Sequence, residues 1–143
     1  MTVRDILAAK GNDVVTIGPS STLADAARAL AQHRIGAVVV TGPGDRIVGI
    51  LSERDIVRVV GEQGAEALAG PVSEAMSTSV KLCNENHTVN EVMGIMTRGR
   101  FRHLPVERDG HLVGIVSIGD VVKQRIEDVE REAEEIRNYI ATA

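Results

Sequence analysis

Two segments of the chain share one pattern of apolar and polar positions. Residues 113–122 repeat residues 48–57, 65 positions earlier. Each copy has a short apolar run with one glycine, then a serine, two further residues, an aspartate and two β-branched residues. This pattern predicts a strand that ends at the serine and passes into a helix. A hydroxyl and a carboxylate should therefore lie together at two helix starts, Ser52 with Asp55 and Ser117 with Asp120.

The rest of the chain follows the same duplication. Thr22 and Thr88 each begin a Thr-x-x-acid pattern, which is typical of a helix start. The following residues place apolar side chains at spacings of three and four, one stripe per helix: Leu23, Ala26, Ala27 and Leu30, then Val89, Val92, Met93 and Met96. A short helical segment precedes each half, at 3–7 and 72–76, and we call these two segments the prefaces. The other paired segments are brief strands at 15–17 and 80–82, strands at 36–40 and 102–106, and turns at 42–45 and 107–110. Each half is predicted to be β-α-β-β-α.

The strand at 37–40 is apolar without alternation, which predicts burial of both its faces. Two short helices cannot cover a three-stranded sheet on both sides, so the halves are expected to pack together by their sheets and to leave clefts between them. The predicted fold is α/β, with two tandem motifs in a pseudo-twofold arrangement. Motif 1, with the N-terminal helix and a linker at 61–71 that contains a helical turn at 65–68, occupies residues 1–70. Motif 2 occupies 71–123, and a C-terminal helix occupies 124–143.

The C-terminal helix carries a narrow apolar stripe. Nothing in the sequence stops this helix after Asp120, and it is expected to reach about residue 141. Its apolar residues recur at spacings of four and three, as in a coiled-coil seam: Val122, Ile126, Val129, Ala133, Ile136 and Ile140. Such a stripe on an otherwise charged helix predicts a partner helix, and we expect a homodimer.

Composition narrows the class of protein. With 43% hydrophobic and 25% charged residues, the chain is expected to be globular. Its only aromatic residues are Phe101 and Tyr139, so the core must be aliphatic, and a base-stacking surface for single-stranded nucleic acid is disfavoured. The net charge of −4 lies beyond residue 126, on an acidic tail, and gives no general attraction to nucleic acid or anionic lipid.

Cysteine content and hydropathy bear on the compartment. The single Cys83 cannot form an internal disulfide, and the N-terminus has no charged-apolar-small leader, so a cytoplasmic protein is expected. No apolar run approaches the roughly 20 residues needed to cross a bilayer. Cys83 has no partner in a metal or redox pattern, and His33, His87 and His111 are isolated, so no metal site is predicted.

The duplicated strand, Gly-hydrophobic-hydrophobic-Ser, two residues, Asp and helix resemble the end of a CBS motif, the module named after cystathionine β-synthase. The resemblance covers roughly residues 3–123. It implies tandem motifs that bind adenine nucleotides and similar ligands, usually to regulate something else. AMP, ADP, ATP and NAD(H) all offer the adenosine and phosphate that the clefts would recognise.

By this resemblance Asp55 and Asp120 bind ribose, and Ser52 and Ser117 bind phosphate. Physical chemistry agrees, because N–H groups at a helix start attract phosphate and a carboxylate can accept both ribose hydroxyls. The alternative is a plain helix cap, in which the serine oxygen accepts an early helix N–H. Because the Ser-x-x-Asp pattern occurs twice in matching contexts, ligand binding is favoured over a purely capping role.

A basic cluster precedes the strand at 104–106: Arg98, Arg100, Arg102 and His103, around Phe101. Arg98 and Arg100 are interpreted as a solvated loop face. The resemblance implies that Arg102 and His103 supply cations to a ligand phosphate, which a guanidinium binds well. We expect this pair to make the Asp120 cleft the stronger one for monophosphates, with His103 contributing when protonated, below about pH 6.5.

The first half has Gly36 and Ala37 at the positions of that cationic pair, so it is expected to bind phosphate more weakly, with Arg54 as the substitute cation. Val15 and Val80, in the first strand of each half, complete the candidate ligand-binding residues.

No enzymatic activity is predicted, since no nucleophile is paired with a general base, and Gly42 to Gly44 form a turn rather than a nucleotide-binding loop. The predicted function is a stand-alone sensor that binds adenine nucleotide and signals in trans to an effector protein. The alternatives are an interaction scaffold with vestigial clefts, a nucleic-acid binder that uses Arg98 to Arg102, and an enzyme acting on a nucleotide.

Overall fold

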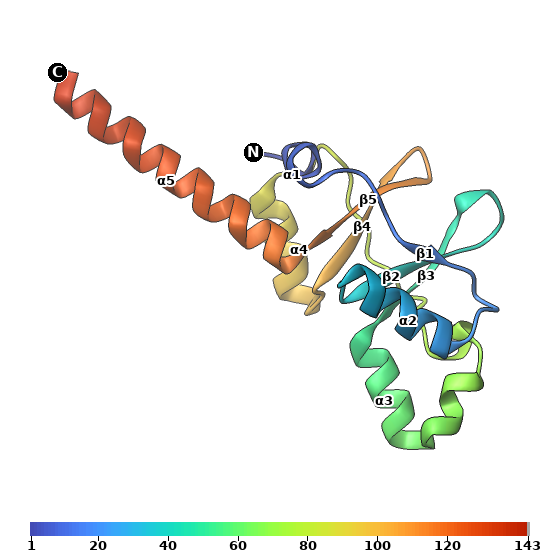
Figure 1. The fold of residues 1–143 in the computed structure, drawn as a ribbon. Helices are drawn as coiled ribbons and strands as arrows, with labels where there is room; N and C mark the ends of the chain where they lie inside the picture. The colour runs from blue at the N-terminus through green and yellow to red at the C-terminus, as the bar shows by residue number, and fades with distance from the viewer. Residues whose placement is uncertain (143) are drawn as a thin grey trace.

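The computed structural model describes residues 1–142 (Figure 1). The first half contains α1 (Val3–Lys10), β1 (Thr16–Ile17), α2 (Leu23–His33), β2 (Ala37–Thr41), the 3-10 turn η1 (Pro43–Asp45), β3 (Ile47–Ser52) and α3 (Glu53–Gln63). The 3-10 turns η2 (Ala65–Ala69) and η3 (Val72–Glu74) follow, and η2 confirms the helical turn expected in the linker. The second half contains α4 (Val89–Gly99), β4 (His103–Arg108), β5 (His111–Ser117) and α5 (Ile118–Thr142).

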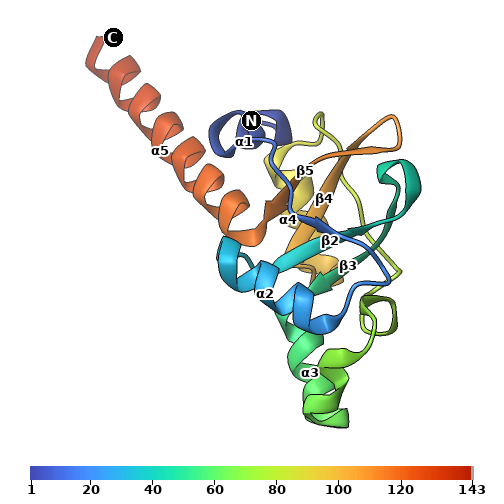
Figure 2. The ribbon, with the colours of Figure 1, turned by 45° about the vertical axis from the view of Figure 1, so that its right-hand side comes forward.

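Each half forms its own sheet. β1 pairs in parallel with β2, β2 pairs antiparallel with β3, and β4 pairs antiparallel with β5. The two hairpins correspond closely, and each has a register shift at the same point, after Val40 in β2 and after Val106 in β4. In both views the sheets lie side by side, with α2 and α3 beyond one and α4 and α5 beyond the other (Figures 1 and 2). The predicted fold class is confirmed.

The predicted strand at 80–82 is wrong, because β4 carries a proline where β2 carries a valine. In the first half, the backbone N–H of Val39 donates to the carbonyl of Val15 and helps to pair β1 with β2. Pro105 occupies the corresponding place in β4 and has no N–H to donate. Pairing in the second half is reduced to one parallel bridge between Cys83 and Val106.

Local sequence accounts for both ends of α2 and α4. The Thr22 hydroxyl oxygen accepts the N–H of Asp25, and the Thr88 hydroxyl oxygen accepts the N–H of Glu91, as the capping patterns predict. Both helices end at an arginine in the left-handed region, Arg34 with φ 53° and Arg100 with φ 56°. This conformation reverses the chain, so each helix leads directly into β2 or β4.

The preface of each half packs into the hydrophobic core of the other half. Val3, Ile6 and Leu7 of α1 precede the first half in sequence but are buried in the core of the second half, with α4, β4 and β5. Val72 and Ala75 precede the second half and are buried in the core of the first half. Each preface therefore joins its own half to the core of the other, and the predicted boundary at residue 70 separates the repeats in sequence but not in packing.

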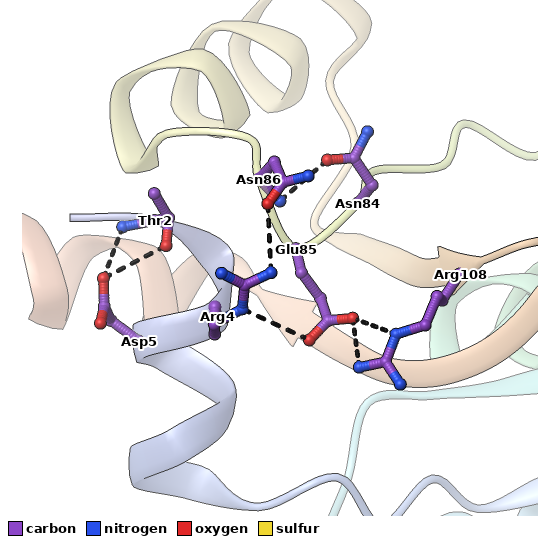
Figure 3. Close-up of polar contacts among 7 residues, drawn as sticks. All are labelled: Thr2, Arg4, Asp5, Asn84, Glu85, Asn86 and Arg108. Carbon is purple, nitrogen blue, oxygen red and sulfur yellow. Dashed lines mark hydrogen bonds and ion pairs between the residues drawn. The ribbon is translucent and has the colours of Figure 1, made fainter.

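The first turn of α1 is tied to the second half by polar contacts (Figure 3). Asp5 accepts the backbone N–H of Thr2 at 2.9 Å, which caps the helix. The Glu85 carboxylate lies between two arginines, 3.9 Å from Arg4 Nε and 2.7 Å from Arg108 Nε. The backbone N–H of Arg4 also donates to the Glu85 carbonyl at 3.1 Å, so this end of α1 is fixed to the loop before α4.

The glycines of the duplicated strands make room for the exchanged prefaces. A Cβ atom at Gly49 would lie 2.6 Å from Met76 Sδ and 2.9 Å from the Ser77 carbonyl oxygen, which is backbone. A Cβ at Gly114 would lie 2.8 Å from Leu7 Cδ2, the flexible end of a side chain. We expect Gly49→Ala to lower the free energy of unfolding by about 1–3 kcal/mol, as overpacking does, and Gly114→Ala to lower it less.

Urea denaturation at one protein concentration measures the free energy of unfolding of both variants. Gly61→Ala, in α3 with nothing within 4 Å of its Cβ, is the control, and it should be neutral or stabilising. Equal losses for Gly49→Ala and Gly114→Ala would contradict the backbone contact at Gly49.

Helix α5 extends well beyond the body of the molecule (Figures 1 and 2). Its inner face packs through Val121, Gln124 and Asp128, and every residue from 129 to 142 is exposed. The predicted seam points to solvent in this single chain: Val122, Ile126, Val129, Ile136 and Ile140 are among the exposed large apolar side chains.

Candidate ligand-binding clefts

Both Ser-x-x-Asp segments form closed capping turns. The Asp55 carboxylate accepts the backbone N–H of Ser52 at 2.9 Å and its hydroxyl at 3.1 Å, and the Ser52 oxygen accepts the N–H of Asp55 at 3.3 Å. In the second copy, Asp120 accepts the N–H of Ser117 at 2.9 Å, and Ser117 accepts the N–H of Asp120 at 3.1 Å. The capping role that the sequence left as an alternative is therefore real, and the question becomes whether these turns also face a ligand site.

They do, because each turn lines a cleft between the halves. The cleft that contains Asp55, which we call the Asp55 cleft, has a volume of about 480 Å³, within the usual range for small-molecule sites. Its first-half lining comes from Gly36 and Ala37 at the start of β2, from β3 and from the start of α3. Its second-half lining includes Val80, Lys81, Arg100, Phe101, Arg102 and His103.

The second cleft contains Asp120 and has a volume of about 400 Å³. We call it the Asp120 cleft. Ser117, Ile115 and His103 line it from the second half. Residues of the first half form the other side: Lys10, Asp13, Val14, Val15, Arg34, Ile35, Gly36 and Ala37.

The clefts thus cross the halves. Each combines the Ser-x-x-Asp turn of one half with the segment that leads into β2 or β4 of the other half, 34–37 or 100–103. The prediction that Arg102 strengthens the Asp120 cleft is therefore wrong, because Arg102 lines the Asp55 cleft. The correction has a geometric cause, since Arg102, just before β4, and Asp120, in the first turn of α5, belong to one half but line different clefts. His103, Gly36, Ala37 and Ser117 line both clefts.

The Asp55 cleft is strongly cationic. Four positively charged side chains line it, Arg54, Lys81, Arg100 and Arg102, against the carboxylates of Glu53 and Asp55. The first residues of α3 and of α5, including Ile118 and Gly119, line it as well, and a helix start carries partial positive charge. Arg100, interpreted from sequence as a solvated loop residue, belongs to this cleft, whereas Arg98 lines a separate groove with His87 and Ile95.

His103 lies at the junction of the clefts, with its ring against Gly36. A Cβ atom on that glycine would be 3.3 Å from His103 Nε2. Burial lowers the pKa of His103 below its ordinary value of 6.5, and this effect outweighs the nearby carboxylates of Glu53 and Asp120. His103 is therefore expected to gain its proton at a lower pH than the value of about 6.5 expected from the sequence. The imidazole is neutral at pH 7 and becomes a cation only at lower pH.

Lys10 is a cleft residue that sequence reasoning missed. Its ammonium donates to Asp120 Oδ2 at 2.7 Å and to the Ile115 carbonyl at 3.0 Å. Burial raises the pKa of Asp120, but the hydrogen bonds from Lys10 and Ser117 outweigh burial and hold that pKa below its usual value. The only sequence signal was a lysine in the last turn of the first helix, a position that a helix dipole favours in any case.

The remaining candidates are structural. Burial raises the pKa of the Cys83 thiol to about 12, which agrees with an inert thiol. His87 accepts the backbone N–H of Asn84 through Nδ1 at 2.9 Å. Within residues 1–142, no three His, Cys, Asp or Glu side chains are grouped as a metal site would require. No helix in that range is both long and apolar enough to span a membrane.

Comparison with known proteins identifies the family. The model of the CBS domain matches residues 3–62 and 72–127. The chain belongs to the CBS-domain family. The crystal structure of the CBS-domain containing protein ATU1752 from Agrobacterium tumefaciens is 52% identical, with a TM-score of 0.85 over 87% of this chain and 99% of that one. The mitochondrial CBS domain-containing protein CBSX3 of Arabidopsis thaliana is 33% identical over 97% of this chain and 71% of its own length.

A more distant likeness concerns the fold alone. The CBS domain pair of protein MJ0100, solved in complex with 5′-methylthioadenosine and S-adenosyl-L-methionine, is 23% identical, with a TM-score of 0.80 over 90% of this chain and 98% of that chain. Together these likenesses make the chain a tandem CBS pair of the regulatory class.

Proposed function

We propose that this CBS pair is a cytoplasmic, homodimeric, non-enzymatic sensor that binds an adenine nucleotide (AMP, ADP, ATP or NAD(H)) and passes the signal in trans to an effector protein. The observation that carries the proposal is the Asp55 cleft. It combines a carboxylate at a helix start, four cationic side chains and an apolar lining in one cavity of about 480 Å³. These are the groups that ribose, phosphate and base require.

Each part of a nucleotide has a matching region. Asp55 can accept the ribose hydroxyls, as the family resemblance implies. Phe101, Ile50 and Val80 offer apolar surface to the base. Arg102 and Arg100 come from the opposite half and can bind phosphate, for which guanidinium geometry is well suited. MJ0100, with the same fold, is solved with two adenosine compounds, which supports an adenosine ligand in a CBS pair.

The charge of the cleft also favours more than one phosphate. Four cations face two carboxylates, and the starts of α3 and α5 add partial positive charge. We therefore expect ADP and ATP to bind at least as tightly as AMP. The nucleic-acid alternative is less favoured, because Arg100 and Arg102 line a concave cleft instead of forming an open basic face with Arg98.

Thermal shift with adenosine, AMP, ADP, ATP and NAD⁺ tests the proposal. A nucleotide at 100 times its dissociation constant should stabilise the fold by about 2.7 kcal/mol, so a clear rise in melting temperature is expected for at least one of them. A scaffold with vestigial clefts predicts no shift with any. A nucleic-acid binder predicts retention on DNA or RNA that falls steeply with salt.

A further inference from the structure

The Lys10 ammonium forms an ion pair with the Asp120 carboxylate in the Asp120 cleft. Its ammonium lies 2.7 Å from Asp120 Oδ2 and 3.0 Å from the Ile115 carbonyl oxygen, and both acceptors line the cleft. The Lys10 and Asp120 side chains are 33% and 25% exposed, so a ligand can reach the pair from solvent. Two polar acceptors of this cleft, the Asp120 carboxylate and the Ile115 carbonyl, are therefore already bound by the protein itself.

The Asp55 cleft differs at the corresponding points. Asp55 pairs with Arg58, on the same helix and at 3.2 Å, and not with a residue of the exchanged preface. Ile50, the counterpart of Ile115, offers its carbonyl to the backbone N–H of Ser77 at 2.9 Å. At the Asp120 cleft, α1 remains helical as far as Lys10. The Lys10 ammonium, and not a backbone N–H, donates to the Ile115 carbonyl there.

We propose that Lys10 is an internal competitor at the Asp120 cleft: a nucleoside must displace its ammonium from Asp120 Oδ2 before both ribose hydroxyls can bind that carboxylate. This inference rests on the proposed function and adds a regulation to one of its two clefts. Asp55 is also held by a cation, Arg58 on its own helix, but Arg58 does not line the Asp55 cleft, whereas Lys10 lines the Asp120 cleft.

Displacement of Lys10 releases the last turn of α1 and leaves its first turn in place. The first turn is fixed by the Thr2 cap and by Glu85 (Figure 3), at the opposite end of α1 from Lys10. Helix α1 packs against β5 and α5. Filling the Asp120 cleft is therefore linked to the packing of α5, the helix that carries the exposed apolar stripe.

The test uses adenosine, because an uncharged probe gains nothing from a lysine. Asp55→Asn silences the Asp55 cleft, and calorimetry then compares this protein with Asp55→Asn/Lys10→Met, in which the side chain keeps its length but loses its charge. We expect Lys10→Met to raise adenosine affinity by about two- to fivefold, the size of a partly exposed ion pair. Asp55→Asn/Lys123→Met is the matched control, since Lys123 is exposed on α5 and lines neither cleft, and it should leave the affinity unchanged.

Hydrogen exchange gives a second measurement. The backbone N–H of Gly11 donates to the Leu7 carbonyl at 2.7 Å at the end of α1. Adenosine should speed exchange of this N–H in the Asp55→Asn protein, and Lys10→Met should speed it without adenosine.

An unchanged or lower adenosine affinity in Asp55→Asn/Lys10→Met overturns the role of Lys10, as does slower exchange at Gly11 when adenosine binds. In both cases the proposed function stands if wild type binds adenosine and Asp55→Asn weakens that binding. Absence of adenosine and nucleotide binding by wild type and every variant overturns the proposed function itself, and the competitor with it.

Discussion

Replacing Ile136 and Ile140 by lysine is expected to dissociate the proposed homodimer into monomers. Both side chains belong to the seam of α5 and are 60% and 68% exposed in the single chain. Full burial of one isoleucine is worth roughly 1.5–3 kcal/mol, and a symmetric contact buries each residue twice. The double substitution should weaken self-association at least about a hundredfold.

Light scattering over a range of protein concentrations measures this effect. The matched control is Asn138→Lys/Ala141→Lys, which adds the same two charges to the same exposed part of α5 but off the seam. It should remain dimeric. Point substitutions are preferable to truncation after Lys123, because truncation also removes Gln124 and Asp128, whose side chains pack against the body. A dimer that survives Ile136→Lys/Ile140→Lys would show that the seam is not the contact.

Replacing Arg102 by alanine should weaken AMP binding about ten- to hundredfold and leave adenosine binding nearly unchanged. A hydrogen bond to a charged group contributes about 1.5–3 kcal/mol, and this one is made only to phosphate. Asp55→Ala should weaken AMP and adenosine alike, because ribose is common to both ligands.

Calorimetric titration of both ligands into these variants decides whether Arg102 shares a cleft with Asp55 or with Asp120. Arg98→Ala is the matched control, because Arg98 belongs to the same basic cluster but lines a different groove. The crossed arrangement predicts that Asp120→Ala leaves the tight, Arg102-dependent site intact. Loss of that site in Asp120→Ala, with Asp55→Ala unaffected, would show that Arg102 serves the other cleft after all. Equal losses of AMP and adenosine in Arg102→Ala would mean that the arginine supports the cleft and does not bind phosphate.

The sequence assigned Arg102 to the Asp120 cleft, and the structure places it in the Asp55 cleft, for a clear reason. The sequence showed that Arg102 and His103 correspond to Gly36 and Ala37, and this is correct in the structure. It could not show which Ser-x-x-Asp turn each pair faces. Residues close in sequence share a half, whereas each cleft is built from two halves, so Arg102 lines the cleft of the Ser-x-x-Asp turn that belongs to the other half.

The absent strand at 80–82 was within reach of the sequence. Aligning the two halves places Pro105 opposite Val39, and a proline in a central strand cannot pair through its missing N–H. The exchange of prefaces had a weaker signal. Gly49 and Gly114 indicate that something approaches each strand closely, but not that Met76 and Leu7 do so from the opposite repeat.

The sequence by itself determined the duplicated strands and helices, the caps at Thr22, Thr88, Ser52 and Ser117, and the long C-terminal helix with its stripe. These features depend on contacts within a few residues, where spacing fixes geometry. Only the tertiary structure decided that Arg102 shares a cleft with Asp55, that Lys10 binds Asp120, and that burial lowers the pKa of His103. Those contacts join residues up to 110 positions apart, and they follow from how two similar cores pack against each other, which no local pattern specifies.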